Sequence, residues 1–225
     1  MAQKDVGNKV PIYKLKETKE VMDFYDEWGQ DNKYDQDMVD WNYTGPKETA
    51  EVFNKHQKEK DIDIYDAGCG TGLVGVELKK YGFANFFGAD LSQKLLDLVP
   101  NNLYKKLDKV DLNKPINEKD DQYDALMCVG TFTFGHVKPP ALDEFIRITK
   151  NKGLICFTIN EGIYEEYGFD KKIKQLKNEK DTAICVRGYD EFNHFLKDEP
   201  AKVEIDFDAL ERFKELDKQY KKTAS

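Results

Sequence analysis

The segment that most constrains the fold is residues 61–72, DIDIYDAGCGTG, where a β-rich run leads into an acid and then into alternating glycines. The run alternates polar and apolar residues, which is typical of a strand. Glycines let a backbone turn sharply and let a ligand approach the main chain, and the helix predicted next, Val74–Tyr81, offers backbone N–H groups at its start. The segment therefore predicts a strand–loop–helix unit with a ligand-binding loop; the alternative is an ordinary tight turn.

Strands and helices alternate along the chain that follows. Such alternation requires crossover connections, which produce a parallel sheet covered by helices on both faces. We therefore expect a single Rossmann-like α/β/α domain of three layers. The further strands are predicted at 85–89, 107–110, 123–129 and 154–159, the helices at 92–99 (capped by Ser92), 141–150 and 163–176, and two extended segments at 182–187 and 203–207.

The length of 225 residues suits one α/β domain with a sizeable core. We expect residues 1–60 to form a helical lead-in or lid that belongs to this domain, helical from about Thr18 and again over 47–56. Residues 61–207 form the expected Rossmann-like core, and residues 208–225 a polar C-terminal helix or tail.

The charge of the chain argues against several classes of function. The formal net charge is −8 and the pI about 5.1, and an acidic surface repels a nucleic-acid backbone. No apolar run of about 18 residues predicts a membrane span, and the N-terminus lacks the apolar stretch of a signal peptide, so we expect a cytoplasmic protein. The four cysteines form no C-x-x-C pair; we therefore expect buried, reduced thiols and no metal site.

Two acids follow predicted strands at positions where doubly wound folds bind ligands. The sixth position of a dinucleotide fingerprint needs a small residue, but Leu73 stands there, so the loop departs from NAD or FAD binding. Asp90 ends the next strand, about 20 residues on, where a carboxylate accepts hydrogen bonds from ribose hydroxyls. The alternative is a helix-capping Asp, although Ser92 is better placed for that. Asp111 would face an adenine amino group while Leu112 packs on the ring; a plain turn Asp is the alternative.

Four motifs together resemble the class I S-adenosylmethionine-dependent methyltransferases: DAGCGTG at 66–72, GADLS at 88–92, VDL at 110–112 and YDALMCVG at 123–130. The resemblance implies a mostly parallel seven-stranded sheet with an antiparallel last strand, which residues 203–207 would supply. It also implies S-adenosyl-L-methionine as the cofactor, with the glycine loop at its methionine part. The cofactor-binding residues expected in this way are Trp28, Tyr34, Asp66, Gly68, Cys69, Gly70, Gly72, Asp90, Leu91, Asp111, Leu112 and Val129.

A narrower resemblance is to the Williams–Beuren-region methyltransferase-like proteins. It is carried by FYDEWGQDNKYDQDMVDWNYTGP at 24–46 and VGTFTFGHVKPPALDEFIRITKNKGLICFT at 129–158. The chain departs from that family at Asn151-Lys152-Gly153, where Pro-Gly-Gly is usual, and in its longer charged tail. In the lead-in, Trp28 and Tyr34 would close over the cofactor and Tyr25 would contact the acceptor. The alternative is that these aromatic side chains pack the N-terminal helix onto the sheet.

The residues for the transfer step itself are less clearly marked. His136 follows the fourth strand, at the edge where open α/β sheets bind ligands, and its ordinary pKa suits a general base near neutrality. The alternative is a structural histidine bonded to a loop carbonyl. Glu161 and Tyr164 follow the fifth strand and would line the acceptor pocket; alternatively, they are a helix-start acid and a packing side chain.

The end of the fourth strand bears on the acceptor. It reads Val129-Gly130-Thr131-Phe132 and lacks the Asn/Asp-Pro-Pro-aromatic tetrapeptide that nucleobase-methylating members of the family often carry. The absence of this tetrapeptide, together with the negative net charge, favours a small-molecule acceptor. The sequence leaves open which atom is methylated (oxygen, nitrogen or sulfur) and the oligomeric state. The alternatives are a non-catalytic cofactor-binding interaction protein and a protein or nucleic-acid methyltransferase. We expect neither a nucleic-acid partner nor membrane association.

Overall fold

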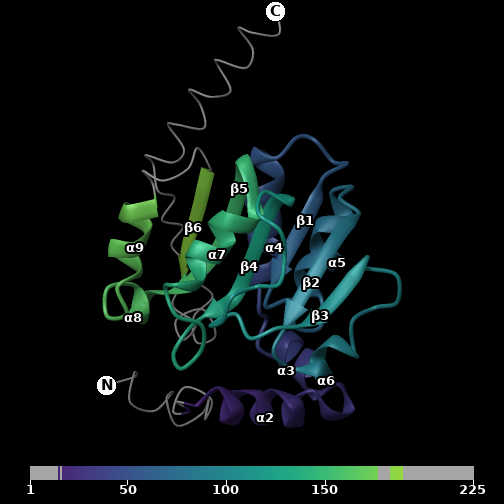
Figure 1. Cartoon of the computed structure of the whole chain (residues 1–225). Helices are drawn as coiled ribbons and strands as arrows, with labels where there is room; N and C mark the ends of the chain where they lie inside the picture. The colour runs from purple at the N-terminus through teal and green to yellow at the C-terminus, as the bar shows by residue number, and fades with distance from the viewer. Residues whose placement is uncertain (1–14, 16, 177–182, 190–225) are drawn as a thin grey trace, which may run out of the picture.

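The computed structural model describes residues 15, 17–176 and 183–189. Within this part, six strands form one sheet in the order β3-β2-β1-β4-β5-β6, and every neighbouring pair is parallel (Figure 1). The order reverses between β1 and β4, which creates the crevice where open α/β sheets bind ligands. The strands are β1 (Asp63–Ala67), β2 (Asn85–Asp90), β3 (Lys106–Lys109), β4 (Tyr123–Phe132), β5 (Thr149–Asn160) and β6 (Ala183–Tyr189).

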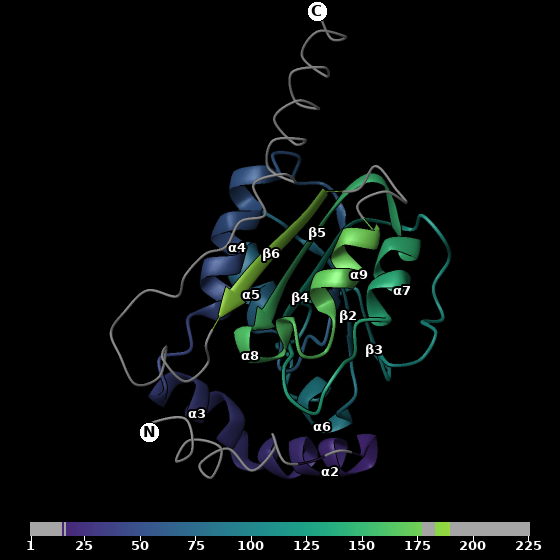
Figure 2. The ribbon, with the colours of Figure 1, turned by 90° about the vertical axis from the view of Figure 1, so that its left-hand side faces the viewer.

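Helices cover both faces of the sheet, as Figure 2 shows. On one face lie α4 (Gly45–His56) and α5 (Leu73–Lys80), and on the other lie α7 (Ala141–Ile148) and α9 (Phe169–Leu176). The expected α/β domain with a parallel sheet between two helical layers is therefore confirmed for the described residues. Two single-turn helices, α6 (Gln93–Leu96) and α8 (Glu161–Tyr164), follow β2 and β5.

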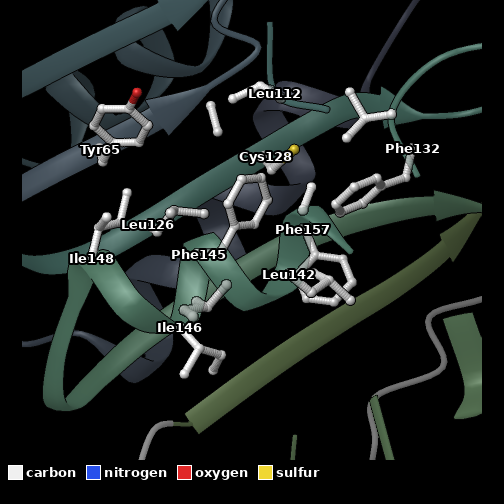
Figure 3. Close-up of a cluster of buried hydrophobic side chains, with 14 of the residues drawn as sticks. Tyr65, Leu112, Leu126, Cys128, Phe132, Leu142, Phe145, Ile146, Ile148 and Phe157 are labelled. Atoms are coloured by element: carbon white, nitrogen blue, oxygen red, sulfur yellow. The ribbon is translucent and has the colours of Figure 1, made fainter. Parts of the chain in front are cut away.

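Each face of the sheet has its own apolar core. Under α7 and α9, the aromatic side chains of Phe132, Phe145 and Phe157 are buried together (Figure 3). On the opposite face, buried side chains of α4 and α5, such as Phe53 and Leu78, pack against side chains of the sheet. Burying a large apolar side chain contributes about 1.5–3 kcal/mol, so these two cores hold the strands that carry the site.

The N-terminal lead-in runs along the carboxyl edge of the sheet (Figure 1). It comprises α2 (Thr18–Trp28), a 3-10 turn η2 (Gln30–Asn32) and α3 (Lys33–Asp40). Asp31 and Asn32 have φ values of 52° and 59°, a left-handed conformation that turns the chain between the two helices. The lead-in therefore crosses the edge of the sheet at which ligands bind.

None of the described helices is long and apolar enough to cross a membrane.

Several predicted boundaries are confirmed and others are wrong. The side-chain oxygen of Ser92 accepts a hydrogen bond from Leu95 N at 3.2 Å, so the predicted cap is confirmed, but α6 ends at Leu96 and not at residue 99. The helix predicted at 163–176 is interrupted at Gly168, whose φ of 81° is not helical. The predicted strand at 203–207 and tail at 208–225 lie outside the described residues.

Candidate functional site

A cavity lies between the carboxyl edge of the sheet and the lead-in, lined by residues at or after the carboxyl ends of β1, β2, β3 and β4 and by residues of α2 and α3. It holds about 690 Å³ of empty space, part of which is open to solvent. The structure thus brings together residues that are far apart in the sequence. The predicted site residues on its wall are Tyr25, Tyr34, Gly68, Gly70, Asp90, Leu91, Asp111, Leu112, Val129 and His136.

The glycine-rich loop follows β1 and is folded tightly against its neighbours. Gly68 has a φ of 76°, and a Cβ at this position would lie 2.2 Å from Thr131 Oγ1, so both the conformation and the space require glycine. The backbone N–H of Gly70 donates to Asp90 Oδ2 at 2.9 Å. The loop therefore exposes bare backbone to the cavity while its position is fixed by β2 and β4.

Asp90 ends β2 and faces the cavity. Its carboxylate accepts hydrogen bonds from Gly70 N and Ser92 N, each at 2.9 Å, one on each oxygen. Burial raises its pKa above the usual range, and these backbone N–H groups oppose that rise. Because each carboxylate oxygen accepts more than one hydrogen bond, the oriented group retains acceptor capacity for a ligand.

Asp111 and Leu112 also reach the cavity, on the side of β3. Asp111 Oδ1 accepts from Asn113 N at 3.0 Å, and Oδ2 lies 3.2 Å from Lys114 Nζ, which are the contacts expected of a turn Asp. Leu112 is 4% exposed and belongs to the core beneath α7, so it offers the cavity a fixed apolar surface. The two roles proposed for Asp111, turn residue and ligand acceptor, are therefore compatible.

Four predicted cofactor residues lie behind the wall and not on it: Trp28, Asp66, Cys69 and Gly72 are not among the described lining residues. Asp66 accepts a 2.5 Å hydrogen bond from the Tyr104 hydroxyl. Burial raises the pKa of the Cys69 thiol well above its usual range, so the thiol stays neutral. Gly72 takes a left-handed φ of 88° at the start of α5. Asp66 directly precedes the glycine-rich loop, and Cys69 and Gly72 are part of it.

His136 is held between two hydrogen-bond partners. Its Nδ1 lies 2.6 Å from the carbonyl oxygen of Phe134, and its Nε2 lies 2.9 Å from the Tyr25 hydroxyl. Because a carbonyl only accepts, Nδ1 carries the proton and Nε2 accepts from Tyr25. Burial lowers the pKa of His136 to about 4, so the pKa near neutrality expected from its type is wrong. The bond to a loop carbonyl is the contact that the structural alternative requires.

The lead-in is tied to the core by side-chain hydrogen bonds. Tyr25 bonds His136, Asp26 accepts from Ser92 Oγ at 2.5 Å, and Asp35 accepts from Thr71 Oγ1 at 2.6 Å. Trp28 stays within the lead-in, where Nε1 donates to Asp37 at 2.7 Å and the ring stacks on Tyr25. Tyr25 and Tyr34 thus line the cavity, and Trp28 is not among the described lining residues.

The two residues predicted beyond β5 belong to α8. Tyr164 is partly buried and packs against the core beneath α7. Glu161 begins α8, at the carboxyl end of β5. Their contact with an acceptor stays a prediction.

Sequence reasoning missed about half of the cavity wall. Most of the missed residues lie within one or two positions of a predicted residue, so including the neighbours of each motif would have identified them. Thr18, Val21 and Leu95 have no such signal, because they reach the cavity only through the docking of α2 on α6. The missed residues are Thr18, Val21, Leu95, Val110, Asn113, Gly130, Thr131, Gly135 and Val137.

Known proteins resemble the chain over the same region. A family described as a methyltransferase domain matches residues 64–153. Human methyltransferase-like protein 27 is 33% identical over 139 residues, which are 60% of this chain and 56% of that protein. An uncharacterized protein of Methanocaldococcus jannaschii is 32% identical over 162 residues, which are 69% of this chain and 68% of that protein.

A solved structure from Methanococcus maripaludis is 18% identical with a TM-score of 0.48, over 73% of this chain and 74% of that one. The match to the human protein spans little more than half of its length. The archaeal relative is matched over two thirds of its length, and the matched domain covers β1 to the start of β5 with the glycine-rich loop, Asp90 and Asp111. The chain belongs to the class I S-adenosylmethionine-dependent methyltransferases.

Proposed function

We propose that this protein transfers the methyl group of S-adenosyl-L-methionine to a small-molecule acceptor. The observation that carries the proposal is the convergence of the glycine-rich loop, Asp90 and the Asp111–Leu112 pair on one cavity beneath the lead-in. Each group comes from a different β-strand end, and each has the chemistry that one part of this cofactor needs. When bound, the cofactor supplies an electrophilic methyl group on a sulfonium.

The cavity residues fit the cofactor by chemistry and by space. Asp90 would accept hydrogen bonds from the two ribose hydroxyls, since its carboxylate is oriented by two backbone N–H groups. Leu112 would pack on the adenine ring and Asp111 would accept from its amino group. Gly68 and Gly70 leave room for the methionine part to approach the main chain, with Leu91 and Val129 as apolar wall.

The proposal of a small acceptor rests on enclosure and charge. The lead-in covers the carboxyl edge of the sheet, and the described lining includes Asp90 and Asp111 but no lysine or arginine. A protein that methylates nucleic acid needs positively charged side chains against the phosphate backbone of its acceptor. The absence of such side chains from the described lining disfavours a nucleic-acid acceptor. Tyr25, together with Glu161 and Tyr164 after β5, would contact the acceptor.

We also propose that residues 1–60 act as the lid of a core formed by residues 61–207 and that the protein works in the cytoplasm. The three lead-in hydrogen bonds to the core support the lid. Three cysteines, Cys69, Cys128 and Cys156, are buried free thiols, as is usual in a reducing compartment.

A screen for methyl transfer tests the function. The protein is incubated with S-adenosylmethionine labelled in its methyl group and with pools of amines, alcohols, thiols and carboxylic acids of metabolite size. We expect label in at least one small-molecule pool, and none in RNA, DNA or protein fractions offered in parallel. Label only in a macromolecule, or tight cofactor binding without transfer to any pool, would contradict the proposed acceptor class.

His136 is the proposed base, and it would have to release the Tyr25 hydroxyl before its Nε2 could take a proton from the acceptor. If His136 is the base, His136→Ala lowers turnover about 100-fold or more, while Tyr25→Phe, which leaves Nε2 free but removes one contact of the lid, lowers turnover much less. Because its pKa is about 4, turnover should stay flat through pH 6.5 and fall only as the pH approaches 4. The turnover rates of both variants are measured with the acceptor found in the screen. Equal losses of turnover in the two variants would show that His136 only holds the lid.

A further inference from the structure

Tyr104, in the segment between α6 and β3, fills a slot that three glycines leave open. A Cβ at Gly75 would lie 2.6 Å from the Tyr104 hydroxyl oxygen. A Cβ at Gly88 would lie 3.0 Å from Tyr104 Cδ1, and one at Gly72 would lie 3.2 Å from Cε2. Glycines of the loop, of α5 and of β2 therefore admit one aromatic ring behind the wall of the cavity.

The hydroxyl of Tyr104 holds a carboxylate in this position. It donates to Asp66 Oδ2 at 2.5 Å, and burial keeps the pKa of Tyr104 well above its usual range, so the hydroxyl stays a donor. Asp66 is 1% exposed and stands two residues before Gly68. Its other oxygen, Oδ1, is buried and has no hydrogen-bond partner among the described residues. One oxygen is thus fixed, and the other retains its full acceptor capacity.

We infer that Tyr104 is a positioning residue of the cofactor site, which braces the glycine-rich loop with its ring and, with its hydroxyl, orients Asp66 and favours its charged form. The inference rests on the proposed function. A charged carboxylate with an unused oxygen behind the loop attracts a cationic donor, and the methionine part of S-adenosylmethionine carries an ammonium group. Tyr104 therefore acts on the cofactor through Asp66 and the loop, without touching it.

The ionisable groups around Asp66 set the pH at which it is charged. They are Tyr104, Asp90, Cys69 and Cys128. The pKa of Asp66 is raised to about 7: burial is the main cause of the rise, the hydrogen bond from Tyr104 opposes it, and the negative charge of Asp90 adds to it. Burial also raises the pKa of both thiols, which therefore stay neutral. Removing the Tyr104 hydroxyl leaves only the influences that raise the pKa of Asp66.

The test compares Tyr104→Phe with Tyr65→Phe. Tyr65 is the neighbour of Asp66 in β1, and its buried hydroxyl has no hydrogen-bond partner among the described residues, so it is a matched control. The affinity for S-adenosylhomocysteine is measured by calorimetry from about pH 6 to about pH 9. The ionisation of the ligand itself is common to all variants and cancels in the comparison.

We expect the affinity of Tyr104→Phe to fall several-fold at pH 7, because loss of the hydrogen bond from Tyr104 raises the pKa of Asp66 and so reduces its charged fraction. The affinity should recover at higher pH, while Tyr65→Phe follows the unsubstituted chain. A lower melting temperature with an unchanged affinity and pH profile would mean that Tyr104 is only structural, and would overturn the inference.

A second readout needs no cofactor. Carboxyl-carbon NMR titration of the unliganded chain should show a higher pKa for Asp66 in Tyr104→Phe and also in Gly75→Ala, whose Cβ would displace the hydroxyl although alanine suits the interior of α5. An unchanged pKa in both variants contradicts the inference. If the unsubstituted chain binds no S-adenosylhomocysteine, the proposed function fails and the cofactor role of Tyr104 fails with it. The titration then still decides whether Tyr104 controls Asp66.

Discussion

Replacing Gly68 with alanine is expected to lower the stability of the protein by about 2–5 kcal/mol, which corresponds to a melting temperature lower by roughly 5–15 °C. Two separate effects add at this position. A φ of 76° is strained for any residue with a Cβ, and that Cβ would lie 2.2 Å from Thr131 Oγ1. Because relief of the contact moves the loop or Thr131, both of which line the cavity, cofactor affinity should also fall more than about tenfold. Thermal unfolding and calorimetry measure the two losses.

Two further variants separate the causes. Gly82→Ala serves as a control for backbone strain, since Gly82 has a φ of 89° but nothing within 4 Å of the added Cβ, and it should cost only about 1 kcal/mol. Thr131→Ala removes the closest atoms, so the double variant Gly68→Ala/Thr131→Ala should recover part of the stability that Gly68→Ala loses. Equal costs at Gly68 and Gly82, with no recovery in the double variant, would show that the contact with Thr131 is unimportant.

Replacing Asp90 with alanine is expected to weaken S-adenosylhomocysteine binding about 10- to 150-fold. Hydrogen bonds to a charged group contribute roughly 1.5–3 kcal/mol, and this carboxylate is already oriented by Gly70 N and Ser92 N. The variant also leaves those two N–H groups without their acceptor, so some loss of thermal stability should accompany the loss of affinity. Calorimetric titration of the folded variant gives the dissociation constant.

Asp97→Ala is the matched control for this measurement. Asp97 follows α6 and is exposed, and its side chain accepts a hydrogen bond from Gln93 Nε2 at 2.9 Å. It is not among the described residues that line the cavity. Its replacement removes a carboxylate from the same region without changing the site. If Asp90→Ala folds and binds the ligand as tightly as Asp97→Ala does, then Asp90 is a turn residue and the assignment of the ribose site is wrong.

The parts of the fold that depend on local pattern were predictable. The β4 segment is a continuous apolar run bounded by turn residues, and such a run is typical of a strand buried on both faces. The glycine-rich loop was identifiable because its residues need a conformation that only glycine adopts easily. Asp90 and Asp111 could be placed because they follow strands whose carboxyl ends meet at one edge of a parallel sheet.

Features that depend on long-range contacts could not be predicted in this way. The bond between Tyr25 and His136 joins residues 111 positions apart, and no spacing rule relates them. Burial, with a smaller effect of the positive charge of Lys138, lowers the pKa of His136, so the base expected from residue type alone has a different titration. Tyr104 carried no motif, and its role emerges only when Gly72, Gly75 and Gly88 are seen around one ring.

The central claim is that the cavity beneath the lead-in binds S-adenosylmethionine, and titration of the unsubstituted chain tests it most directly. Calorimetry with S-adenosylmethionine, S-adenosylhomocysteine and NAD, under identical conditions, gives the three affinities. We predict saturable binding of the first two at one site and none of NAD, because Leu73 occupies the position where a dinucleotide fold needs a small residue. Binding of NAD without any signal from S-adenosylmethionine or S-adenosylhomocysteine would contradict the account.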